Sequence, residues 1–86
     1  MEKLNMFDVE LSRVLKVRRK QLEITQKDLA EKFHLNSPVF ISLLESGKQR
    51  LPRTWIRPMA RYLKLPTHKI THWMIKSATY EIRKYE

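Results

Sequence analysis

Apolar residues recur three and four positions apart along most of the chain, which is the spacing of amphipathic helices and not of strands. This pattern and its interruptions predict five helices, near residues 8–22, 25–33, 37–46, 54–65 and 68–84. No segment alternates apolar and polar residues as a half-buried strand would, and no internal repeat is visible. The sequence therefore predicts one all-α domain with short connections and an extended C-terminal helix.

Local capping signals place several helix ends. Asp8 is expected to cap the first helix, and Thr25 with Asp28 three residues later forms a short capping box for the second. The pair Ser37-Pro38 predicts the start of the third helix, with serine as N-cap and proline in the first turn. Gly47, the only glycine in the chain, is expected to end that helix.

Charge narrows the class of partner. The chain carries 18 Lys and Arg against 9 Asp and Glu, a formal net charge of +9. Between Ser46 and Tyr80 there is no acidic residue and there are eight basic ones, namely Lys48, Arg50, Arg53, Arg57, Arg61, Lys64, Lys69 and Lys76. Such a surface attracts a polyanion, most simply nucleic acid, although charge alone does not separate nucleic acid from an anionic membrane. No apolar run is long enough to span a membrane, and there is no cysteine, so we expect a cytoplasmic protein without a membrane partner.

The second and third helices form a helix-turn-helix candidate. Two short helices are joined by a tight turn, and the small residue Ala30 allows the next helix to approach closely. Leu35 is expected to fill the turn, while Ile41 and Leu44 anchor the third helix against the second.

The segments TQKDLAEKF at 25–33 and ISLLESGK at 41–48 resemble the DNA-binding domain of phage lambda-type repressors and Cro, the XRE-like family. The resemblance runs from about Arg13 to Met74. It implies a lambda-repressor-like fold and a repressor that binds a double-stranded DNA operator, in a prokaryotic cell or a phage-infected host, at the nucleoid. On this basis we expect the chain to divide into an N-terminal arm at 1–7, a DNA-binding domain at 8–66 and a C-terminal helix at 67–86 that serves in dimerisation.

The resemblance also implies site residues. The residue that matches Gln26 binds a DNA phosphate in that family, as suits an amide at a helix N-terminus. The expected DNA-binding set is Gln26, Ser37, Pro38, Val39, Phe40, Ser42, Leu43, Ser46, Lys48, Gln49, Arg50 and Arg53. The family pairs the residues that match Arg19 and Glu45, which tie the first helix to the end of the third.

The sequence departs from the family in three ways. Glycine is usual in the family where this chain has Glu23, His34 and Lys64, and the interval from Ala30 to Glu45 is one residue longer, which leaves the register of the third helix open. The recognition face is also unusually apolar. Apolar side chains can read thymine methyl groups. Alternatively, Phe40 and Leu43 belong to the core, or this face meets a protein.

The last helix carries more apolar surface than one face of a monomer can bury. We therefore expect a homodimer that reads two half-sites of an inverted repeat. The residues assigned to the dimer contact are Trp73, Met74, Ile75, Ala78 and Ile82.

Other chemistry is poorly supported. His68 and His72 stand four apart, a spacing that can bind metal, but no cysteine or neighbouring acidic residue completes a site. No nucleophile with a base and no phosphate-binding glycine loop is visible, so we expect no enzyme, cofactor or metal. Two other functions stay open: an antitoxin-like or otherwise partner-bound regulator, and an RNA- or ribosome-associated helix-turn-helix protein.

Overall fold

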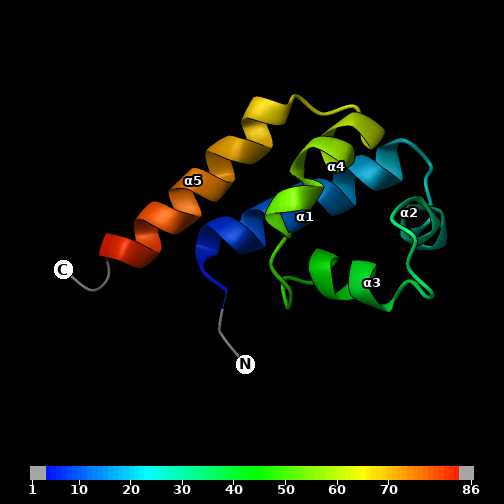
Figure 1. Cartoon of the computed structure of the whole chain (residues 1–86), viewed down its shortest axis with the longest axis horizontal. Coiled ribbons are helices and arrows are strands. Elements are labelled where there is room, and N and C mark those ends of the chain that lie inside the picture. The colour runs from blue at the N-terminus through cyan, green and yellow to red at the C-terminus, as the bar shows by residue number, and fades with distance from the viewer. Residues whose placement is uncertain (1–3, 84–86) are drawn as a thin grey trace.

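The computed structural model describes residues 4–83, and this part of the chain is all-helical with no strand. Its elements are α1 (Met6–Gln21), α2 (Gln26–Lys32), α3 (Val39–Glu45), the 3₁₀ turn η1 (Arg53–Trp55), α4 (Ile56–Tyr62) and α5 (Thr67–Arg83). In Figure 1, α1 runs through the middle, α4 and α5 lie on one side of it, and α2 and α3 lie on the other. The predicted all-α fold of five helices is confirmed.

One hydrophobic core joins all five helices, because each contributes residues at helical spacing to its centre. The largest fully buried side chains are Leu15 of α1, Leu29 of α2, Ile41 and Leu44 of α3, Met59 of α4, Leu63 just after α4, and Ile70 of α5. α1 packs against both α3 and α5, and α4 also packs against α5. The core therefore holds α3 on the opposite side of α1 from α5.

The first helix begins earlier than the sequence predicts. α1 starts at Met6, and its N-cap is Asn5, whose Oδ1 accepts hydrogen bonds from the N–H groups of Phe7 and Asp8 at 3.0 and 3.1 Å. The expectation that Asp8 caps this helix is wrong, because the Asp8 carboxylate is used in tertiary contacts. Positions 5–7 thus belong to the helix start, and residues 1–3 of the expected arm lie outside the described residues.

The capping box of α2 is present as predicted. The Thr25 hydroxyl accepts from the Asp28 N–H at 2.9 Å, and the Asp28 carboxylate accepts from the Thr25 N–H at 3.1 Å. The hydrogen bond from the Thr25 backbone N–H, and after it the adjacent Thr25 side chain, stabilises the charged carboxylate and lowers the pKa of Asp28.

The start of α3 is weaker than predicted. Pro38 occupies the N-cap position and no side chain caps the helix. The Ser37 hydroxyl lies 3.4 Å from the Val39 nitrogen, near the limit for a hydrogen bond. The sequence also predicts Thr67 as the cap of the last helix, but Thr67 is the first residue of α5, and Lys84, where the sequence predicts the end of this helix, lies outside the described residues.

Four helices end on a residue in the left-handed conformation, where glycine carries no steric penalty. These residues are Glu23, His34, Gly47 and Lys64, with φ of 58°, 58°, 76° and 54°. In each case the next residue donates its N–H back across the last turn, as Leu35 does to the Ala30 carbonyl at 2.9 Å. The three positions where the sequence lacks the family's glycine are therefore the three non-glycine residues with positive φ among those described.

The C-terminal helix packs on its own domain. Ile70 is fully buried, and Trp73 and Met74 are half-buried against the core. The exposed large hydrophobic residues of α5 are Ile75, Tyr80 and Ile82, at 59%, 38% and 67% of their maximal surface. Of the expected dimer contacts, Trp73 and Met74 are thus largely occupied within the monomer, whereas Ile75, Ala78 and Ile82 are free to meet a partner.

Candidate nucleic-acid interface

The α2–turn–α3 unit has the internal packing that a helix-turn-helix motif requires. Ala30 of α2 is buried and contributes with Ile41 and Leu44 of α3 to the core. Leu35 in the turn packs partly against the same cluster. The longer turn around Asn36 therefore leaves α3 with its expected inward residues, and its opposite face is turned to solvent.

A buried ion pair fixes the end of α3. Arg19 Nε donates to Glu45 Oε2 at 2.6 Å and Arg19 Nη2 donates to Oε1 at 3.1 Å, and the two side chains are 9% and 3% exposed. Arg19 Nη1 also donates to the Ile24 carbonyl at 2.6 Å. This is the pair implied by the family resemblance, and it joins α1, the start of the α2 segment and α3. Loss of one partner would leave the other buried without compensation.

The Gln26 side chain is hydrogen-bonded to Glu45 of this ion pair. Its Nε2 donates to Glu45 Oε1 at 3.0 Å, and the residue is half-buried at the first position of α2. An amide nitrogen carries two hydrogens. One bond to Glu45 therefore leaves the second N–H able to meet a phosphate oxygen.

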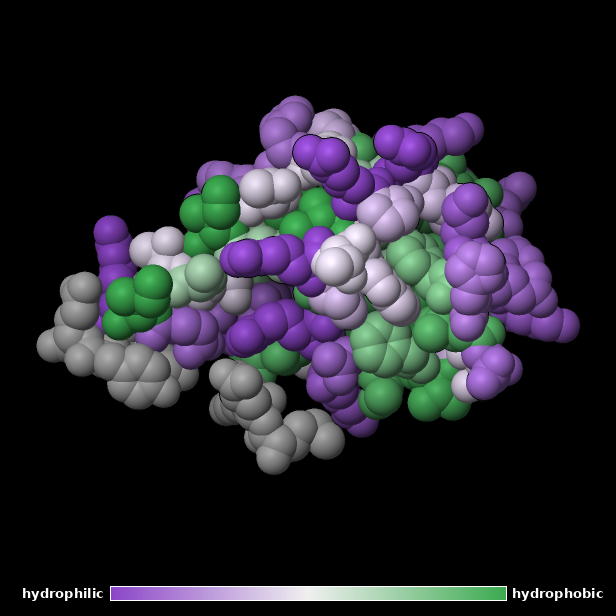
Figure 2. Space-filling view, viewed as in Figure 1, coloured by the Kyte–Doolittle hydropathy of each residue, from purple (hydrophilic) through white to green (hydrophobic). Residues whose placement is uncertain are grey.

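The outward face of α3 is mainly apolar. Val39 and Leu43 are 61% and 37% exposed, and Ser42 between them is also exposed. Figure 2 shows apolar side chains gathered over the position of α3, bordered by hydrophilic residues on the side of α2. Ser37 and Pro38 are exposed just before the helix, and the exposed Ser46 turns its hydroxyl back to the Leu43 carbonyl at 3.1 Å.

Phe40 differs from the other residues expected at this face. Its ring meets the Trp55 ring edge-on, with centroids 5.1 Å apart, and Phe33 stacks on the same indole at 4.3 Å. Phe40 is half-buried. This aromatic group ties α3 to α2 and η1 and leaves Phe40 less exposed than Val39 and Leu43, and contact of Phe40 with DNA stays a prediction.

The loop after α3 carries two free cations. Lys48 and Arg53 are exposed, and no hydrogen bond or ion pair is found for either side chain within residues 4–83. Gln49 is half-buried and its Nε2 lies 3.4 Å from the Arg50 carbonyl. Lys48 and Arg53 therefore have the charge and the freedom that contacts with the DNA backbone require.

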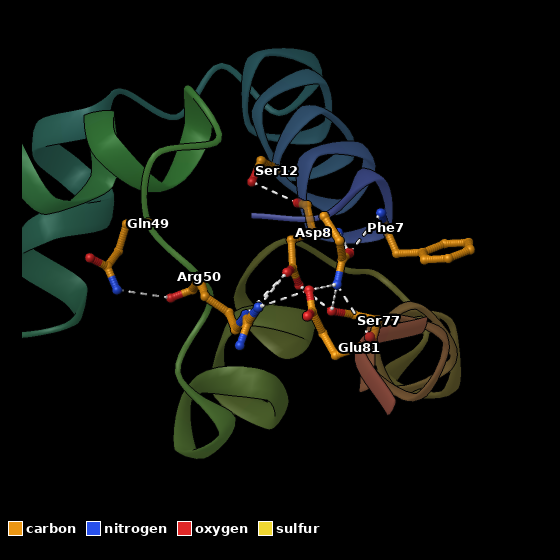
Figure 3. A network of polar contacts seen from close by, with 8 residues as sticks. Phe7, Asp8, Ser12, Gln49, Arg50, Ser77 and Glu81 are labelled. Carbon is orange, nitrogen blue, oxygen red and sulfur yellow. Dashed lines mark hydrogen bonds and ion pairs between the residues drawn. The ribbon is translucent and has the colours of Figure 1, made fainter. Parts of the chain in front are cut away.

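Arg50 in this loop is placed differently from the sequence expectation. Its Nε donates to Asp8 Oδ2 at 3.0 Å and its Nη2 lies 3.0 Å from the same oxygen, with Glu81 at 4.0 Å (Figure 3). Asp8 is buried and the Arg50 side chain is 38% exposed. The guanidinium thus neutralises a buried carboxylate instead of standing free for phosphate.

This contact belongs to a larger polar network that the sequence analysis missed. Ser77 Oγ donates to Asp8 Oδ1 at 2.8 Å, and Asn5 Nδ2 donates to Ser77 Oγ at 2.8 Å and to Glu81 Oε1 at 3.0 Å (Figure 3). The network joins the start of α1, the loop after α3 and the second half of α5. Its members lie up to 76 positions apart in the sequence, so no local pattern could have indicated it.

Two further observations concern residues 4–83 as a whole. No three His, Cys, Asp or Glu side chains in this part gather closely enough to hold a metal ion, and His68 and His72 are both exposed on α5. None of its helices combines the length and the apolar character needed to cross a membrane.

Comparison with known proteins agrees with this geometry. The sequence matches the family described as "Helix-turn-helix domain" over residues 10–73 of its 86 residues, a range that contains α2, α3, the basic loop and the Arg19–Glu45 pair. No curated protein matches the sequence. Because the family match spans most of the chain and coincides with the packed α2–turn–α3 unit, the protein belongs to the helix-turn-helix domain family.

Proposed function

We propose that the protein is a sequence-specific transcriptional regulator, a repressor, which binds double-stranded DNA by placing α3 in the major groove. The observation that carries the proposal is the solvent-facing side of α3, which precedes a loop with two exposed cations, Lys48 and Arg53, that form no ion pair within residues 4–83. In this docking mode base edges meet α3 and phosphates meet the flanking cations and amides. The site of action proposed is the nucleoid of a prokaryotic cell or of a phage-infected host.

The residues proposed to contact the DNA backbone are Gln26, Lys48 and Arg53, and Gln49 lies next to Lys48. Gln26 has one amide hydrogen held by Glu45 and one free, so the core orients it before DNA arrives. Preorganised donors lose less conformational entropy on binding. These contacts position the protein and make its affinity dependent on salt, but they do not select sequence.

The proposed active form is a homodimer. A single recognition helix rarely supplies enough discrimination against a genome, and two subunits related by a twofold axis read half-sites about 34 Å apart. Ile75, Ala78 and Ile82 line an open groove of about 1040 Å³ between α5 and the segment at 49–56. A second copy of the chain that covers this groove would remove the exposed Ile75 and Ile82 from water.

Selection of bound duplexes from a randomised pool tests the proposal. The expected result is an enriched inverted repeat bound by two subunits, and absence of any enriched sequence would contradict specific DNA binding. Ile75→Glu and Ile82→Glu should each give a monomer that binds the inverted repeat more weakly. The control Lys76→Glu changes an exposed residue next to Ile75 and should keep the dimer. Competition with structured RNA at matched salt tests the RNA-binding alternative.

The groove along α5 also favours a second candidate, a regulator bound by another protein, as in an antitoxin. Its apolar lining includes Ile56 and Met74 as well as the exposed isoleucines. Affinity purification from cells that carry the native operon would recover a stoichiometric partner if this candidate holds. Recovery of the chain alone, as a dimer, would support the homodimer.

A further inference from the structure

The recognition helix carries no side chain that can form the paired hydrogen bonds used to identify guanine or adenine. Guanine is read mainly by Arg or Lys and adenine by Asn or Gln. The segment from Ser37 to Ser46 contains none of these four residue types. Its single charged residue, Glu45, is buried in the ion pair with Arg19.

The neighbouring polar residues do not fill this gap. Gln49 is half-buried beyond the end of α3, with its amide nitrogen near the Arg50 carbonyl. The hydroxyl of Ser46 is bonded to its own helix. Asn36 precedes the helix in the turn, three residues before Val39.

Two apolar side chains and one hydroxyl therefore form the exposed centre of α3. Val39 and Leu43 are four positions apart, so they lie on one side of the helix about 6 Å from each other along its axis. Base pairs are spaced about 3.4 Å apart, so two such side chains would meet bases roughly two steps apart. Ser42 lies between them and its hydroxyl can donate or accept.

We infer that the protein identifies its half-site through the C5-methyl groups of thymines, contacted by Val39 and Leu43, with Ser42 adding one hydrogen bond. The inference rests on the proposed function and names the chemistry that α3 reads. Thymine is the one base that presents a methyl group in the major groove, and apolar contact is the established way to read it. Burial against the methyl also removes the exposed valine and leucine from water.

Charge favours DNA over a protein as the occupant of this face. Lys48 lies three residues after the end of α3, Lys27 and Lys32 are exposed on α2, and the chain as a whole carries a net charge of +9. An apolar strip flanked by cations is complementary to a groove with methyl groups inside and phosphates on both edges.

Replacement of thymine by deoxyuridine tests the inference, because it removes only the methyl group. Each thymine of the selected half-site is replaced in turn, and Kd is measured by fluorescence anisotropy at fixed salt. Loss of one buried methyl is worth about 0.8 kcal/mol, so each contacted position should weaken binding about fourfold. Replacement of thymines outside the half-site should have no effect.

Matched variants assign each methyl to a side chain. Val39→Ala should abolish the deoxyuridine effect at one position, and Leu43→Ala should abolish it at a second position about two steps away. Val17→Ala makes the same change as Val39→Ala at an exposed site on α1 and should alter the deoxyuridine effect at neither position. Circular dichroism of each variant verifies that the fold is retained.

The possible failures are distinct. A pool that yields no enriched sequence overturns the proposed function. A well-defined half-site whose affinity is unchanged by deoxyuridine, or whose deoxyuridine effects persist in both alanine variants, overturns methyl readout while specific DNA binding stands.

Discussion

Replacement of the three left-handed residues by glycine should stabilise the protein. Glu23, His34 and Lys64 have φ of 58°, 58° and 54°, and each follows the capping residue of a different helix. Their side chains are exposed, and the turns depend on backbone hydrogen bonds that glycine retains. The substitutions should therefore relieve strain without loss of packing.

The expected magnitude follows from two opposing terms. A non-glycine residue in the left-handed region costs roughly 1–2 kcal/mol. Glycine loses more backbone freedom on folding than other residues, and this lowers the stabilisation by about 0.5–1 kcal/mol. The net stabilisation expected is about 0.5–1 kcal/mol per site and about 1.5–3 kcal/mol for the triple variant, if the three sites act independently.

Urea denaturation followed by far-ultraviolet circular dichroism measures this difference. The midpoint should rise at a constant slope, and each kcal/mol should raise Tm by about 4–8 °C in a domain of this size. Alanine at the same positions removes the side chain but keeps Cβ, so it separates backbone strain from lost charge. As a further control, Glu31→Gly inside α2 should cost about 1 kcal/mol. If the glycine variants are no more stable than the alanine variants, the strain argument is wrong.

Four further outcomes are expected. Thr25→Ala should lower the free energy of unfolding by about 0.5–2 kcal/mol in urea titrations, and an unchanged midpoint would deny the capping box a role. The pKa of Asp28 is lowered in the folded state, so the ionised Asp28 stabilises the fold above the ordinary pKa of 3.8, and this stabilisation is lost as the pH falls through the lowered pKa. Asp28→Asn should remove this acid dependence of the free energy of unfolding. Glu45→Ala should cost about 3–5 kcal/mol, enough to leave little folded protein at 37 °C, and a variant that stays folded would show that the buried pair contributes less to stability than this. Arg50→Ala should cost about 1 kcal/mol of stability, a value kept low because the Arg50 side chain is 38% exposed, and should leave the dependence of DNA affinity on salt unchanged. Arg53→Ala should instead keep the stability and lower the slope of log affinity against log salt by about one unit.

Helical periodicity and the resemblance account for what could be predicted from the sequence. The inward positions of α2 and α3 repeat at helical spacing, and the box of Thr25 and Asp28 involves residues three apart. Both are local, so a single sequence contains the information. The left-handed positions such as Glu23 were indicated by the family's glycines, because a backbone conformation is shared even where the residue is not.

Long-range contacts decide the features that could not be predicted. Asn5 and Asp8 are both good capping residues, and local preference does not choose between them. The choice is made by α5, since Ser77 engages both the Asn5 amide and the Asp8 carboxylate from 69 or more positions away. Arg50 is diverted to the same carboxylate for the same reason.

Packing between distant aromatic residues explains the remaining difference at the site. Phe40 follows Val39 on α3, and the apolar pattern of this helix does not show which of the two is covered. The Trp55 ring in η1 meets the Phe40 ring edge-on, whereas Val39 stays 61% exposed. The composition of the recognition face thus depends on a segment that begins eight residues after α3 ends.

The ratio of Kd values for a scrambled duplex and for the selected duplex, at one salt concentration, tests the central claim most directly. The unaltered chain should prefer the selected duplex by about 10³-fold or more. The combined variant Val39→Ala, Ser42→Ala, Leu43→Ala should lose most of this preference while its affinity for the scrambled duplex stays nearly constant. A ratio near one for the unaltered chain, or an equal loss of affinity for both duplexes in the folded variant, would contradict sequence recognition by α3.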